Sequence, residues 1–214
     1  MMGMRILLGT KILEERDSSF NGKLTVIKDL AWGTYIKGGG LTQCGGVMQM
    51  VWKSALKNLK KKKIDFKEIL ILGLGAGGVT QVISNFWPQA KITGVEIDPV
   101  MVDLGKRYLS LKENKVKIVI QDALEFVKKK SKKKYDLILV DLYVGDDVPE
   151  KNNSLGFFKS VKKLLGKKGI LVVNRLYYGE KRKMAEKTRQ DLEEIFPKVE
   201  STFPEANIMF ICSL

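Results

Sequence analysis

A glycine-rich turn followed by a distant acid is the pattern in this sequence that most clearly indicates chemistry. The turn covers residues 73–78, reads GLGAGG, and follows an apolar run that ends at Leu72. Because glycine lacks a Cβ atom, such a turn lets the backbone approach a ligand closely and adopt positive φ angles. Glu96 follows Gly75 by about twenty residues, where a carboxylate can accept the two hydroxyl groups of a ribose. Together the two features predict a site for a nucleoside.

The turn by itself fits two kinds of nucleoside ligand. Gly73, Gly75 and Gly78 match the dinucleotide fingerprint, whereas Gly73, Gly75 and Gly77 match the turn that binds S-adenosylmethionine. An NAD-dependent oxidoreductase is therefore one alternative, although the chain has no residue set typical of hydride transfer. We expect Gly73, Gly75, Ala76 and Gly77 to lie against the nucleoside.

Two further acids follow predicted strands and favour the second ligand. Asp122, which precedes Ala123, ends the third strand, where an acid could accept the amino group of adenine. Asp141 ends the fourth strand. Because the carboxyl ends of parallel strands line the ligand crevice of an open sheet, we expect Glu96, Asp122 and Asp141 to converge on one site. Such a crevice suits an adenosyl sulfonium, and the alternative for each acid alone is a structural or surface carboxylate.

The elements that must position these residues alternate between strand and helix after Phe66. This alternation is typical of a parallel sheet with helices on both faces, the Rossmann-like α/β architecture. The expected strands are 69–72, 91–95, 116–120, 135–140 and 169–173. The expected helices are 78–86, 99–109, 123–130, 154–165 and about 180–195. Residues 199–203 and 207–212 predict a terminal antiparallel strand pair.

The segment before this core predicts a small β appendage. Residues 22–36 have the pattern of a short antiparallel hairpin, and three glycines at 38–40 end it. A helix is expected over 47–59, where apolar residues recur at helical spacing. We therefore divide the chain into a small N-terminal β region, 1–45, and a Rossmann-like nucleoside-binding catalytic domain, 46–214.

The composition excludes several classes of catalyst. The 214 residues include no histidine and two distant cysteines, Cys44 and Cys212. Zinc sites built on histidine or cysteine clusters, serine–histidine–aspartate triads and histidine general bases are therefore excluded, and we expect no metal. The apolar stretches are too short for a transmembrane helix, and residues 1–10 lack a secretory pattern. We expect a cytoplasmic protein without a membrane partner.

Two lysine tracts, 60–63 and 128–134, carry much of the charge of a chain with 38 Lys and Arg against 24 Asp and Glu, a formal net charge of +14. Phosphate backbones attract such tracts. Both tracts fall between predicted elements, however, where lysines at helix ends complement the helix dipole, and neither has the interleaved aromatic residues of many nucleic-acid sites. We favour solvated lysines and keep nucleic acid as a less favoured partner.

Four segments of the core resemble the spermidine synthases and their homologues. They are 69–78 (ILILGLGAGG), 95–99 (VEIDP), 121–123 (QDA) and 135–141 (YDLILVD). The resemblance extends over about residues 22–174 and includes the β region before the core. It implies a class I methyltransferase-like fold with a mostly parallel seven-stranded sheet. It also implies transfer of an aminopropyl group from decarboxylated S-adenosylmethionine to a diamine, commonly within homodimers.

The resemblance implies a role for each acid. Glu96 corresponds to the acid that binds the ribose, Asp122 to the acid that binds adenine, and Asp141 to the aspartate that receives and deprotonates the attacking amine. Gln43 corresponds to a glutamine that reaches the nucleoside. Because an amine attacks only when it is neutral, a carboxylate at this place can both attract the cation and remove a proton.

Three departures from the family pattern concern the substrates. Ala76 stands where spermidine synthases have an aspartate in the glycine loop, and Val144 stands where they have a second diamine-binding acid. Their Tyr-His-Glu segment is absent, and residues 43–49 take its place. The sequence DLYVGDDVP at 141–149 is closer to an atypical, spermidine synthase-like subgroup.

The loop after the fourth strand offers further candidates. Asp146 and Asp147 could supply the missing acid to the substrate or form a solvated turn before Pro149. Tyr143 could cap the substrate pocket or pack against the loop.

The favoured hypothesis is a transferase that uses S-adenosylmethionine or its decarboxylated form as co-substrate and moves an aminopropyl group to a small-molecule amine, as in polyamine biosynthesis. The main alternative is an S-adenosylmethionine-dependent methyltransferase acting on RNA or another anionic substrate, which the net charge of +14 suggests. A nucleoside-binding homologue without catalytic activity also fits the three departures.

Overall fold

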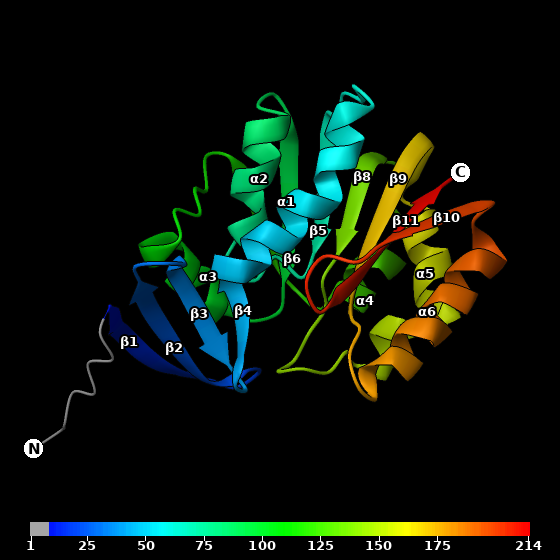
Figure 1. The fold of residues 1–214 in the computed structure, drawn as a ribbon. Coiled ribbons are helices and arrows are strands. Elements are labelled where there is room, and N and C mark those ends of the chain that lie inside the picture. Colours follow the sequence, from blue (N-terminus) through cyan, green and yellow to red (C-terminus); the bar gives the residue numbers. More distant parts are fainter. Residues whose placement is uncertain (1–8) are drawn as a thin grey trace, which may run out of the picture.

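The computed structural model describes residues 9–214, in which the chain forms two β-sheets (Figure 1). The first, the N-terminal sheet, is antiparallel and consists of β1 (Thr10–Ser18), β2 (Gly22–Asp29), β3 (Gly33–Gly38) and β4 (Leu41–Gly45). The strands β2 and β3 form the hairpin predicted at 22–36, and β1 and β4 extend it on either side. Residues 1–8 of the predicted N-terminal region lie outside the described residues.

The second sheet, the main sheet, has seven strands in the order β10-β11-β9-β8-β5-β6-β7. Neighbouring strands among β5 to β9 run parallel, while β11 is antiparallel to β9 and β10 is antiparallel to β11. The predicted fold class is confirmed. The strands are β5 (Glu68–Leu72), β6 (Lys91–Glu96), β7 (Val116–Ile120), β8 (Tyr135–Val140), β9 (Leu165–Leu176), β10 (Lys198–Thr202) and β11 (Asn207–Ser213).

Helices cover both faces of the main sheet because its strands are apolar on both sides. In β5, Ile69 and Ile71 join the buried cluster that contains α1 (Gly46–Lys61) and α2 (Gly78–Phe86). The alternate residues, Leu70 and Leu72, join the cluster on the other face. That face is covered by α4 (Ala123–Lys128), α5 (Leu155–Lys162) and α6 (Lys181–Ile195). Within residues 9–214, no helix combines the length and apolar character needed to cross a membrane.

The N-terminal sheet packs against α1, α2 and α3 (Pro99–Tyr108), and polar contacts fix it at the start of α3. Asp98 is buried and caps this helix by accepting a hydrogen bond from Val100 N at 2.8 Å. The same carboxylate accepts hydrogen bonds from Ser18 Oγ and Asn21 Nδ2, both at 2.6 Å. One side chain therefore fixes the turn between β1 and β2 at the entrance of α3, close to the end of β6.

Three predicted boundaries differ from the structure around β9. The helix predicted at 154–165 ends at Lys162, and β9 already begins at Leu165 instead of at 169. The register between β8 and β9 shifts just after Tyr135, and the strand continues on both sides of this irregularity. At its other end β9 extends to Leu176 because β11 pairs with it as far as Asn207. Pairing with β8 and β11 determines where β9 begins and ends. Such pairing between distant segments cannot be read from a local sequence pattern.

Glu14 of β1 joins the N-terminal sheet to Arg107 and Tyr108 of α3, and we expect this contact to weaken as the pH falls. Hydrogen bonds from Arg107 and Tyr108 lower the pKa of Glu14 from 4.5 to about 2. A carboxyl group whose pKa is lowered by folding stabilises the fold above its unfolded pKa, and this contribution is lost as the pH falls from about 4.5 to about 2. Urea denaturation at pH 6 and pH 3 should show a smaller pH-dependent loss of unfolding free energy in Glu14→Gln than in the wild type.

The matched control for this prediction is Glu15→Gln, the same change at the next residue of β1, whose carboxylate pairs with the exposed Lys23. In Glu15→Gln, the difference in unfolding free energy between pH 6 and pH 3 should be the same as in the wild type. Equal pH dependence in the wild type, Glu14→Gln and Glu15→Gln would contradict the assigned role of Glu14.

Candidate active site

The glycine turn lies at the centre of the main sheet, directly after β5. The chain changes direction there, since β6 and β7 lie on one side of β5 and β8 and β9 on the other. Open α/β sheets bind ligands at this switch point. Gly73 has a φ of 85°, and a Cβ atom at this position would clash with the carbonyl oxygen of Asp141. Glycine is therefore needed for the turn to pass this close to the end of β8.

Glu96 ends β6 and holds the glycine turn in place. Its Oε2 accepts a hydrogen bond from Gly75 N at 2.6 Å, and its Oε1 accepts bonds from Ile97 N at 2.9 Å and Asp98 N at 3.0 Å. Burial raises the pKa of Glu96, and the three backbone amides offset part of that effect. A carboxylate has about four acceptor positions, so the carboxylate that supports the turn can still accept a ligand hydroxyl.

Asp122 caps α4 and pairs with a lysine at the rim of the pocket. Its Oδ1 accepts hydrogen bonds from Leu124 N at 2.8 Å and Glu125 N at 3.1 Å, while Oδ2 lies 2.8 Å from Lys151 Nζ. Burial raises the pKa of Asp122, but the Lys151 ammonium and the two amides outweigh it, and the pKa lies below its usual value. Asp122 and the adjacent Ala123 both line the pocket.

Asp141 follows β8 directly, and two neutral side chains hold its carboxylate. Trp52 Nε1 on α1 donates to Oδ2 and Asn174 Nδ2 on β9 donates to Oδ1, each at 2.9 Å. Burial raises the pKa of Asp141, and these two donors together with the nearby Arg175 charge partly offset the increase. The carboxylate therefore has a fixed orientation and is more basic than an exposed aspartate.

Replacing Trp52 with phenylalanine is expected to raise the pKa of Asp141 further. The indole donor stabilises the ionised carboxylate, so its loss favours the protonated form. The measurement is a carbon-13 NMR titration of the Asp141 carboxyl group. Trp32→Phe, the same change at a half-exposed tryptophan in the turn between β2 and β3, serves as control and should leave the titration unchanged. An unchanged Asp141 titration in Trp52→Phe would show that the indole does not stabilise the carboxylate.

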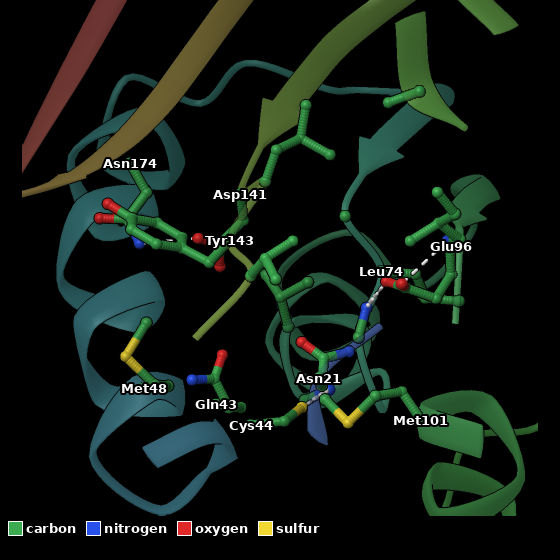
Figure 2. A pocket seen from close by; sticks show the side chains of 18 of the residues that line it. Asn21, Gln43, Cys44, Met48, Leu74, Glu96, Met101, Asp141, Tyr143 and Asn174 are labelled. Carbon is green, nitrogen blue, oxygen red and sulfur yellow. Dashed lines mark hydrogen bonds between the residues drawn. The ribbon is translucent and has the colours of Figure 1, made fainter. Parts of the chain in front are cut away.

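The glycine turn and the three acids face one cavity of 360 Å³, in which Glu96 lies on one side and Tyr143 and Asn174 on the other (Figure 2). Tyr143 Oη accepts a hydrogen bond from Leu176 N at 2.7 Å, which holds its ring at the wall of the cavity. Gln43 Nε2 donates to the carbonyl oxygens of Gly38 at 3.0 Å and Gly145 at 2.8 Å. Gln43 thereby joins the N-terminal sheet to the loop after β8.

Some predicted site residues do not line this cavity. Ala76 is fully buried in the apolar cluster between the glycine turn, α3 and the N-terminal sheet. Gly77 has a φ of 82° and faces Leu111, which leaves no room for a side chain. Asp146 and Asp147 lie on the exposed loop and pair with Lys181 of α6 at 3.0 and 2.5 Å. The path of the backbone through the glycine turn directs Ala76 and Gly77 away from the cavity. The ion pairs with Lys181 hold Asp146 and Asp147 outside it.

Other residues of the cavity have no clear signal in the sequence. Asn174 directly follows the strand predicted at 169–173, so the rule that predicts Asp122 and Asp141 at strand ends also applies to it. Trp52 lies inside a helix whose apolar spacing predicts packing only. Asn21 comes from the turn between β1 and β2 and lines the cavity because Asp98 fixes that turn. Among the described residues, no group of three or more acids and cysteines is arranged to hold a metal ion.

Comparisons with known proteins identify related sequences. Residues 48–208 match the family model of the spermine/spermidine synthase domain. The chain is 31% identical over 142 residues to an eEF1A lysine and N-terminal methyltransferase homolog of Drosophila melanogaster, covering 62% of this chain and 21% of that protein. It is 31% identical over 160 residues to a polyamine aminopropyltransferase of Clostridioides difficile, covering 69% and 56%. The chain thus spans about a fifth and about half of these two relatives.

A solved structure shares the fold. Spermidine synthase in complex with the transition state analogue AdoDATO aligns with a TM-score of 0.78 over 95% of this chain and 73% of that one, at 15% identity. The family model covers most of the chain, from α1 to the beginning of β11, and includes the glycine turn and all three acids of the cavity. The chain therefore belongs to the spermine/spermidine synthase family.

Proposed function

We propose that the protein is a transferase that binds decarboxylated S-adenosylmethionine or S-adenosylmethionine and transfers an aminopropyl group to an amine, a reaction of the type used in polyamine biosynthesis. The observation that carries the proposal is Asp141, an oriented carboxylate that faces the same cavity as the glycine turn and Glu96. The family match and the polyamine aminopropyltransferase relative support it.

In this reaction the nitrogen lone pair of the neutral amine forms a bond to the propyl carbon next to sulfur. The carbon–sulfur bond breaks, its electron pair stays on sulfur, and 5′-methylthioadenosine leaves as a neutral thioether. The nitrogen loses a proton to the Asp141 carboxylate, whose raised pKa suits a general base. The sulfonium is a good leaving group, so the remaining task of the site is alignment of the reacting atoms.

The charges around the cavity favour the decarboxylated nucleoside. Lys151 is the one cationic residue among the described residues that line the cavity, and it pairs with Asp122. The other end, around Asp141, is lined by amides, an indole and a phenol. The carboxylate of S-adenosylmethionine would there approach the Asp141 carboxylate with no cationic side chain in the cavity lining to pair with it, since Arg175 lies behind the lining and donates to neutral oxygens. The decarboxylated form presents only an ammonium. Burying an unpaired charge is strongly unfavourable.

Calorimetric titration of the purified protein with each nucleoside tests this proposal. Decarboxylated S-adenosylmethionine is expected to bind with a dissociation constant at least about tenfold lower than that of S-adenosylmethionine, a difference of about 1.4 kcal/mol. Equal or tighter binding of S-adenosylmethionine would contradict the proposed donor and favour methyl transfer. Binding of neither nucleoside would contradict the whole class of function.

Methyl transfer is the second candidate function, and two observations favour it. The methyltransferase homolog of Drosophila melanogaster is among the relatives, and Ala76 and Val144 supply no acids to bind the amines of polyamine substrates.

The positions of the lysine tracts argue against RNA as the acceptor. They precede β5 and β8, at the amino ends of these strands. The cavity lies at the carboxyl ends, about 17 Å away along a five-residue strand.

We propose further that the N-terminal region, 1–45, forms part of the nucleoside site and that 46–214 is the catalytic domain. Asn21 and Gln43, which line the cavity, come from the first segment and support this division. We also propose that the protein works as a homodimer in the cytoplasm, for which the family resemblance is the support. Light scattering of the purified protein tests the homodimer.

A further inference from the structure

The charged side chains of the cavity that we assign to the transfer reaction balance the positive charges of one donor molecule. Resting on the proposed function, we infer that the acceptor is a primary amine whose far end is uncharged, such as an amino alcohol, and that it is not a diamine. The charge of the cavity, the direction of the loop acids and the neutral lining around Asp141 each support this inference.

The charged side chains of the cavity balance the donor by itself. Among the described lining residues these are Glu96, Asp122, Asp141 and Lys151, which together carry a net charge of −2. The decarboxylated nucleoside carries two positive charges, one on its sulfonium and one on its ammonium. An acceptor that is neutral when it attacks leaves this balance unchanged. The second ammonium of a diamine would add a positive charge without a carboxylate to pair with it.

The loop after β8 does not provide the missing carboxylate. Asp146 and Asp147 both pair with Lys181 outside the cavity, and their side chains are 47% and 69% exposed. The turn that carries them is fixed, because Val144 N donates to Asp147 O at 2.8 Å and Gln43 Nε2 donates to the carbonyl oxygen of Gly145, also at 2.8 Å. Val144 and Gly145 of this turn line the cavity, and neither carries a charge.

Neutral groups surround Asp141 itself. Trp52 and Asn174 donate to its two oxygens, and Asn207 Nδ2 donates to Asn174 Oδ1 at 2.9 Å. Met48 lies one helical turn before Trp52 on α1 and also lines the cavity. These groups can pack against a carbon chain or form hydrogen bonds with a hydroxyl group, but none carries a negative charge.

A buried cation behind this wall further disfavours a second ammonium. Arg175 is 1% exposed and donates to Asn153 Oδ1 at 2.7 Å, to the carbonyl oxygen of Asn174 at 2.6 Å and to Thr188 Oγ1 at 3.3 Å. All of these acceptors are neutral, so the positive charge of Arg175 extends towards Asp141. The Arg175 charge lowers the pKa of Asp141 and adds positive potential where a second ammonium would have to lie.

The test compares two acceptors of equal length, 4-aminobutan-1-ol and 1,4-diaminobutane, with decarboxylated S-adenosylmethionine as donor. In either case the amine displaces 5′-methylthioadenosine, whose release is followed by chromatography, and mass spectrometry identifies the aminopropylated product. We expect kcat/KM to be at least about tenfold higher for the amino alcohol, because an unpaired ammonium costs at least one tenfold factor in binding.

The outcomes separate this inference from the function on which it rests. An equal or higher kcat/KM for 1,4-diaminobutane overturns the inference and leaves the aminopropyltransferase intact. If the protein binds the decarboxylated nucleoside by calorimetry but releases no 5′-methylthioadenosine with either amine, both the proposed transfer and the inference are wrong.

A pair of variants tests the charge argument directly. Val144→Asp adds a carboxylate at the cavity wall and should raise kcat/KM for 1,4-diaminobutane, relative to that for 4-aminobutan-1-ol, by about tenfold, since charge-assisted hydrogen bonds are among the strongest. Val144→Asn has the same shape without the charge and should leave this ratio unchanged. Equal ratios in the two variants would overturn the inference, because shape alone would then explain the preference.

Discussion

Replacing Asp141 with asparagine is expected to lower kcat by about 10²- to 10⁴-fold, the usual contribution of a general base. Asparagine keeps the shape of the side chain but cannot accept a proton from the attacking amine. Binding of 5′-methylthioadenosine should change by less than about threefold, because this product lacks the amine-bearing tail and the loss of a remote contact is within the scatter of single substitutions. The measurements are steady-state kinetics with an amine acceptor and calorimetry with 5′-methylthioadenosine.

The control for this substitution is Asp65→Asn, which makes the same chemical change at an exposed aspartate before β5. It should leave both kcat and the dissociation constant at wild-type values. A wild-type kcat in Asp141→Asn would show that Asp141 is not the general base. A large loss of 5′-methylthioadenosine affinity would show that Asp141 supports the nucleoside site instead.

Replacing Glu96 with glutamine should have its largest effect on nucleoside affinity. The carboxylate accepts bonds from Gly75 N and two further amides and leaves a position for the ribose. Glutamine has one acceptor oxygen and one NH₂ group, so an N–H must face either the turn or the ligand. A hydrogen bond to a charged group contributes about 1.5–3 kcal/mol, which predicts an increase of the dissociation constant by about 10- to 150-fold.

Calorimetry with decarboxylated S-adenosylmethionine measures this effect, and thermal unfolding shows whether the fold is retained. Glu125→Gln, on the exposed side of α4, is the matched control and should bind like the wild type. An affinity for Glu96→Gln within threefold of the wild type would mean that Glu96 only supports the glycine turn and does not contact the ribose.

The sequence predicts those parts of the site that depend on strand ends. Alternating apolar strands and helices determine the main sheet, and the carboxyl ends of parallel strands meet at one edge. Glu96 is the last residue of β6, and Asp122 and Asp141 lie within two residues of the ends of β7 and β8. A local pattern is therefore sufficient to expect them together, and all three line one cavity. Gly73 belongs to the same pattern, because the turn must pass the end of β8.

The sequence does not predict contacts that depend on packing between distant elements. Trp52 reaches Asp141 across 89 residues of sequence, and its helical spacing resembles that of any core residue. Lys181 holds Asp146 and Asp147 outside the cavity from a helix that begins more than thirty residues later. Ala76 faces the apolar cluster because of the path of the backbone through the glycine turn, which the residue types alone do not determine.

The most direct test of the account is identification of the nucleoside product. The purified protein is incubated with an equimolar mixture of S-adenosylmethionine and its decarboxylated form and with an excess of primary amine, and the products are separated by liquid chromatography and mass spectrometry. We expect 5′-methylthioadenosine and an aminopropylated amine, both strongly reduced in Asp141→Asn. S-adenosylhomocysteine and a methylated amine as the main products would contradict it.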